Sequence, residues 1–123
     1  MSGGARIHGI GVDVVDLARF AQTLERTPEV AARLFRPGER GLSTERLAAR
    51  FAAKEAFVKA LRGAAGLSWQ DIEVVADDRG APDLVLSGAA AARVAELGVT
   101  AVHVSLSHDT SVATAFVVAE VGE

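Results

Sequence analysis

The feature that most constrains the fold is a long, uninterrupted helical stretch between Leu42 and Arg62. It contains no glycine or proline and is rich in Ala, Leu, Glu, Lys and Arg, which favour helices. Ser43 or Thr44 can cap its start, and the glycine after Arg62 can end it. In a chain of 123 residues, such a helix predicts one domain, spanning residues 1–123 and built around it.

This helix carries an acidic residue on its apolar side. At about 100° per residue, Leu47, Phe51 and Val58 share one side, and Glu55 falls in the same arc. A carboxylate is costly there unless a cation meets it. Lys59 lies one turn later, at the spacing of a helix ion pair. Two interpretations remain: a surface ion pair beside the core, or a metal-binding carboxylate followed by a phosphate-binding lysine.

A strand is predicted at Ile7–Val15, and one of its faces carries almost no side chains. Alternation places Gly9, Gly11 and Asp13 on that face, and Ile10, Val12 and Val14 on the other. Two glycines beside a carboxylate would let a ligand approach the backbone closely, or would accommodate a packed neighbouring element.

The remaining pattern predicts an α+β fold with mostly antiparallel strands. The last strand is apolar on both faces, which is typical of a strand covered on both sides. A chain this small has few elements with which to cover the second face of this strand. This favours a subunit interface on that face, although helices of the same chain could also cover it. The expected helices are Leu17–Arg26, a short one ending at Leu34, and Ala89–Leu97; the expected strands are Asp71–Ala76, Asp83–Leu86, Ala101–Ser107 and Val112–Val121.

Composition excludes several classes of function. Without cysteine, the chain has no disulfides and no thiol chemistry. It shows no signal peptide and no apolar segment near the ~20 residues that span a bilayer, so we expect a cytoplasmic protein with no membrane association. The net charge of −3 argues against nucleic acid as a partner. Residues 1–62 nevertheless carry 11 basic against 7 acidic side chains, and residues 63–123 carry 2 against 9, so one half could present a basic surface.

Three separated motifs carry a family resemblance. They are Gly9-Ile-Gly-Val-Asp13 followed by Arg19, Arg50-Phe-Ala-Ala-Lys-Glu-Ala56 followed by Lys59, and Val104-Ser-Leu-Ser-His108. In this order and at this chain length, they resemble holo-acyl-carrier-protein synthase, the short single-domain type of 4′-phosphopantetheinyl transferase. The stretch between Arg36 and Arg46 is shorter than is common in that family.

The resemblance implies a fold in which a mostly antiparallel sheet packs on a long central helix and shorter helices. It implies transfer of phosphopantetheine from coenzyme A to a serine of an apo acyl carrier protein, with release of adenosine 3′,5′-bisphosphate. The carrier would be of the fatty-acid or the polyketide or peptide synthase type. The enzyme would be a homotrimer, with coenzyme A bound between subunits.

The resemblance also implies roles for individual residues. Asp13 and Glu55 would hold Mg²⁺, and Lys59 would contact the coenzyme phosphates. Arg19, Arg50 and His108 would lie around the coenzyme or the carrier. The proposed catalytic residues are therefore Glu55, Lys59 and His108.

The chemistry of these residues suits attack of a hydroxyl on a pyrophosphate. Two carboxylates match the number that Mg²⁺ usually takes from protein beside phosphates and waters. Either Glu55, acting through a water on the metal, or His108 could accept the proton of the attacking serine. Two other functions are compatible with the same residues: a trimeric domain that binds coenzyme A without turnover, and a metal-dependent phosphohydrolase that uses water as nucleophile.

Overall fold

The computed structural model describes residues 4–63 and 66–122, and it contains two antiparallel sheets. The larger has the order β1-β5-β4, from β1 (Arg6–Asp16), β4 (Val99–His108) and β5 (Val112–Val121). The smaller pairs β2 (Ile72–Ala76) with β3 (Pro82–Leu86). The predicted α+β class with antiparallel strands is confirmed.

Four helices complete the described part of the chain: α1 (Leu17–Arg26), α2 (Glu29–Leu34), α3 (Thr44–Ala60) and α4 (Gly88–Leu97). Side-chain caps set the starts of two of them, and the cap at Ser43 is one that the sequence predicted. The Asp16 carboxylate accepts a hydrogen bond from the Arg19 amide at 2.9 Å, and the Ser43 hydroxyl accepts one from the Arg46 amide at 3.4 Å. None of these helices is long and apolar enough to cross a membrane.

Helix α3 packs closely against the larger sheet because the facing side chains are small. A Cβ atom added at Gly9 would lie 2.0 Å from the Ala60 carbonyl oxygen, and one at Gly11 would lie 1.8 Å from that of Ala56. Helix and strand backbones are therefore in direct contact, and the glycines accommodate a packed element rather than a ligand. The buried small residues that line this contact include Ala52, Ala53, Ala56 and Ala60 of α3 and Ala113, Ala115, Val117 and Ala119 of β5.

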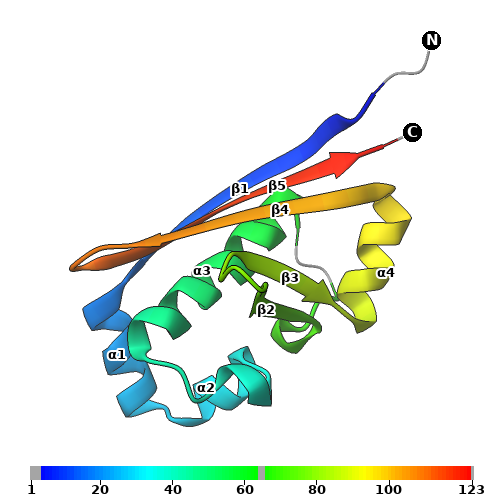
Figure 1. The fold of residues 1–123 in the computed structure, drawn as a ribbon. Coiled ribbons are helices and arrows are strands. Elements are labelled where there is room, and N and C mark those ends of the chain that lie inside the picture. The colour runs from blue at the N-terminus through cyan, green and yellow to red at the C-terminus, as the bar shows by residue number, and fades with distance from the viewer. Residues whose placement is uncertain (1–3, 64–65, 123) are drawn as a thin grey trace.

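All four helices and the β2–β3 hairpin lie on one side of the larger sheet (Figure 1). The opposite side is uncovered by described elements. It is apolar over β1 and β5, where the exposed fractions of Ile10, Val12, Val14 and Phe116 are 52%, 53%, 62% and 46%, and polar over β4, where His103, Ser105 and Ser107 are exposed. Strand β5 was expected to be covered on both faces. Within this chain only one face is covered, because no described element crosses the other.

Some element ends differ from the predictions. Strand β2 begins at Ile72 because Trp69–Asp71 form a 3₁₀ turn, and a second such turn, Pro37–Glu39, lies between α2 and α3. The buried side of α3 is wider than the predicted stripe and displaced from it. Phe51 and Val58 of the stripe are only partly buried, whereas residues outside it are buried: Ala48, Ala49, Ala52, Ala53, Lys54, Ala56 and Phe57. A helix enclosed on several sides buries residues that one amphipathic stripe does not include.

Candidate active site

The contact between β1 and α3 brings three of the predicted site residues together. Asp13 lies on β1 beyond the two glycines, and Glu55 and Lys59 lie on α3. The Lys59 Nζ atom donates to Asp13 Oδ1 at 3.0 Å and to the Val12 carbonyl oxygen at 2.9 Å. The lysine thus pairs with Asp13 across the helix–strand contact, whereas among the described residues Glu55 forms no ion pair.

The electrostatics of Glu55 indicate a site suited to a cation. Burial raises the pKa of the Glu55 carboxyl, the negative charge of Asp13 raises it further, and Lys59 partly opposes the shift. Two carboxylates that repel each other at the wall of one cavity are both stabilised when a positive ion lies between them. Two protein oxygen ligands, with phosphates and waters, suit Mg²⁺. The described residues contain no group of three or more metal-ligating side chains, so a bound ion would need ligands from elsewhere.

Asp13 and Glu55 line a cavity of about 750 Å³ between β1 and helices α1, α2 and α3. Its wall also carries Arg19, the third predicted residue found here. The floor is apolar and built around Phe20 and Phe51, whose rings stack at 5.7 Å between centroids. The cavity therefore combines charged groups on its wall with an apolar surface beside them.

Arg50 and His108 lie elsewhere. They line a second cavity of about 430 Å³, together with Arg46, Gly80 and Pro82. Burial lowers the pKa of the Arg50 guanidinium, Glu39 opposes that shift, and Arg46 adds to it. Arg46 was not singled out from the sequence, although its spacing of one helical turn from Arg50 on α3 places both guanidinium groups on the same side of the helix.

The predicted residues therefore form two groups within one chain. Asp13, Glu55 and Arg19 line the first cavity, and Arg50 and His108 line the second. Lys59 is half-exposed and contacts the first group through Asp13. One chain does not unite the two groups in a single cavity.

Sequence reasoning also missed a buried ion pair behind the second cavity. Lys54 and Glu39 are 0% and 1% exposed, and Lys54 Nζ lies 2.8 Å from Glu39 Oε1. A signal was present, because Arg50 and Lys54 interrupt a helical stripe that runs from Leu47 to Phe57. Charged residues within an apolar stripe indicate buried partners.

Comparisons with known proteins agree with this architecture. Residues 9–117 match the family model described as the 4′-phosphopantetheinyl transferase superfamily. The holo-[acyl-carrier-protein] synthase of Clavibacter sepedonicus is 60% identical over 114 residues, which cover 93% of this chain and 96% of that relative. The protein of the same name from Frankia casuarinae is 58% identical over 113 residues, covering 91% and 96%.

Solved structures give the same result. The holo-ACP synthase of Plasmodium yoelii superposes with a TM-score of 0.88 at 27% identity and covers 98% of this chain and 100% of its own. A holo-(acyl-carrier-protein) synthase from Bacillus anthracis, in complex with CoA (3′,5′-ADP), superposes with a TM-score of 0.77 at 38% identity, covering 94% and 98%. The chain therefore belongs to the 4′-phosphopantetheinyl transferase superfamily and, within it, to the holo-acyl-carrier-protein synthases.

Proposed function

We propose that this enzyme transfers the 4′-phosphopantetheine group of coenzyme A to a serine of an apo acyl carrier protein in a Mg²⁺-dependent reaction. The serine oxygen forms a bond to the phosphorus that bears the pantetheine. The pyrophosphate P–O bond breaks, and adenosine 3′,5′-bisphosphate leaves. The observation that carries the proposal is the pairing of Asp13 with Glu55 in one cavity, with Lys59 adjacent.

Each residue of the first cavity has a role in this proposal. Asp13 and Glu55 would hold the Mg²⁺, which would supply positive charge to offset that of the pyrophosphate. Lys59 can exchange its contact with Asp13 for one with the phosphates, since its ammonium is half-exposed. Of the two candidate bases, only Glu55 lies in the same cavity as Asp13. His108 of the same chain lines the other cavity. In this proposal Glu55, acting through a water, accepts the serine proton, and the His108 that assembly brings near the site contacts the coenzyme.

We further propose that the enzyme is a homotrimer. Its subunits would cover the apolar outer face of the larger sheet, where Ile10, Val12, Val14 and Phe116 lie exposed. Apolar patches of this kind usually mark interaction surfaces. Assembly would place the Arg50 and His108 cavity of one subunit beside the Asp13 and Glu55 cavity of another. This arrangement accounts for the division of the site residues within one chain.

The decisive experiment incubates the protein with coenzyme A, Mg²⁺ and several apo carriers from fatty-acid, polyketide and peptide synthases. Intact mass of each carrier is the readout. We expect a gain of one phosphopantetheine group on at least one carrier, and near-complete loss of that gain in Asp13→Asn. Release of free phosphopantetheine without a modified carrier would indicate a phosphohydrolase. Binding of coenzyme A without any product would indicate a non-catalytic domain.

A further inference from the structure

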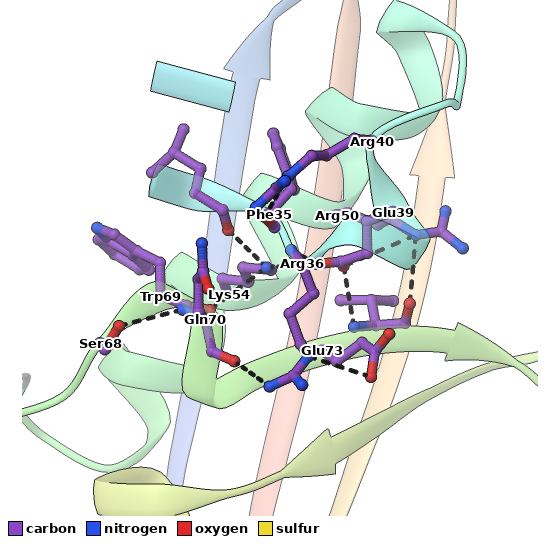
Figure 2. Close-up of polar contacts among 12 residues, drawn as sticks. Phe35, Arg36, Glu39, Arg40, Arg50, Lys54, Ser68, Trp69, Gln70 and Glu73 are labelled. Atoms are coloured by element: carbon purple, nitrogen blue, oxygen red, sulfur yellow. Dashed lines mark hydrogen bonds and ion pairs between the residues drawn. The ribbon is translucent and has the colours of Figure 1, made fainter. Parts of the chain in front are cut away.

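The buried face of α3 contains an ammonium group whose hydrogen-bonding capacity is fully used. Lys54 Nζ donates to the Leu34 carbonyl oxygen at 2.6 Å, to Glu39 Oε1 at 2.8 Å and to the Trp69 carbonyl oxygen at 3.3 Å (Figure 2). An ammonium has three protons, and each has an acceptor here. Burial lowers the pKa of Lys54, and the hydrogen bond to Glu39 opposes that shift. The pair holds Glu39 at a defined position against α3.

The Glu39 carboxylate uses both oxygens. Oε1 accepts from the Arg36 amide at 3.0 Å and from Lys54 at 2.8 Å. Oε2 accepts from the Val74 amide at 3.1 Å and lies 4.0 Å from Arg50 Nε. A glutamine has the same shape, but one of its two terminal atoms is an NH₂ group, which donates. In either orientation of the amide, this group would face two of the nitrogens named above, which also donate. Only a carboxylate accepts hydrogen bonds from three of these nitrogens while its charge attracts the fourth, Arg50 Nε.

Arg50 is held on the side that faces Glu39. Its polar contacts with described residues use Nε alone, which donates to the Val74 carbonyl oxygen at 3.3 Å and faces Glu39 Oε2 (Figure 2). The side chain is only 16% exposed, yet it lines the second cavity. The two terminal nitrogens of the guanidinium therefore remain for an anion in that cavity. Glu39 itself does not line the cavity; it contacts two residues that do, Arg50 and, through the backbone amide, Val74. Of these two, only Arg50 carries a charge that a phosphate would meet.

We propose that Glu39 is a positioning residue for coenzyme binding: anchored by Lys54, its carboxylate orients the Arg50 guanidinium toward a phosphate group of the coenzyme. The inference rests on the proposed function, since it takes coenzyme A as the ligand of the second cavity. Without this support, the long arginine side chain would be free to adopt other rotamers. Contact with the phosphate would then carry an additional cost in conformational entropy.

The test is a double-mutant cycle on coenzyme A affinity, measured by calorimetry without a carrier. Arg50→Met removes the guanidinium, and Glu39→Gln removes its support. We expect each change alone to weaken binding about tenfold, the scale of one lost contact to a charged group. We expect the double variant to bind no more weakly than Arg50→Met, because in the proposal the effect of Glu39 on the ligand passes through Arg50.

Steady-state kinetics give a second readout that a general loss of stability would not produce. In Glu39→Gln, the KM for coenzyme A should rise about tenfold while kcat and the KM for the carrier stay within about twofold. Phe57→Leu is the matched control. Phe57 is fully buried on α3, and its truncation should lower the melting temperature without changing coenzyme A affinity.

Glu39→Gln leaves a buried ammonium short of an acceptor and could prevent folding. Glu39→Gln/Lys54→Met removes both charges together and keeps the volume, which buried ion pairs often tolerate. It should fold and show the same loss of affinity. Additive losses in the cycle, unchanged affinity in both Glu39 variants, or failure of both to fold would overturn the proposal while the transferase function stands. A wild-type protein that binds no coenzyme A would overturn both.

Discussion

The contact between β1 and α3 allows a quantitative prediction for Gly11→Ala. The new methyl group would lie 1.8 Å from the Ala56 carbonyl oxygen and 2.9 Å from the Ala60 amide nitrogen. Both neighbours are backbone atoms of a buried helix, so no side chain can rotate away. Relieving the clash even to 3.0 Å would require α3 and β1 to separate by about 1.2 Å.

The cost of that separation is at the upper end of the range for overpacked cores, about 3 kcal/mol. For a domain of this size, such a loss lowers the melting temperature by about 10 °C. The same movement would stretch the 3.0 Å contact between Asp13 and Lys59, because the two residues lie on the separating elements. We therefore expect transfer activity to fall at least about tenfold even at temperatures where the variant is folded.

Calorimetry at fixed protein concentration and carrier mass measurements at 20 °C test this prediction. Gly41→Ala is the matched control, since a methyl group there meets nothing within 4 Å. It should melt within about 2 °C of the wild type and keep its activity. A Gly11→Ala variant that melts and transfers like the wild type would show that the glycine is not required for the helix–strand contact.

Three further predictions follow from the charges and the bare sheet face. Glu55→Gln should raise the melting temperature at neutral pH without metal. The raised pKa of Glu55 means that its ionised form destabilises the folded protein. The gain in melting temperature should therefore vanish as pH falls below 4.5, the ordinary pKa of the group. A gain that stays the same from pH 3 to 8 would contradict this reasoning. Phe116→Glu should yield a monomer mass in light scattering and no transfer activity, because a charge would enter the proposed subunit contact. A trimer mass for this variant would exclude that contact. Arg26→Glu should weaken binding of a carrier with an acidic surface, and more at low salt than at high salt. The reason is that Arg26 is an exposed cation on α1, in no ion pair with a described residue; an unchanged half-saturation concentration would place the docking surface elsewhere.

The sequence by itself determined the features that depend on local order along the chain. The composition of 44–60 favours a helix, and Asp16 and Ser43 cap the helices that follow them. The short apolar run in 112–121, rich in valine, marks a strand, and the Gly-x-Asp and Lys-Glu motifs identify the family. Period and capping are properties of neighbouring residues, so a linear reading detects them.

Only the tertiary structure decided how distant residues are paired. Lys59 has Glu55 one turn away on its own helix, yet it contacts Asp13, because the glycines of β1 allow α3 to approach closely. Glu39 meets Lys54 across 15 positions, and Arg50 and His108 share a cavity that excludes Asp13. These outcomes depend on which surfaces become buried against one another. The free energies of burial, desolvation and close packing that select among them arise only when the chain is folded.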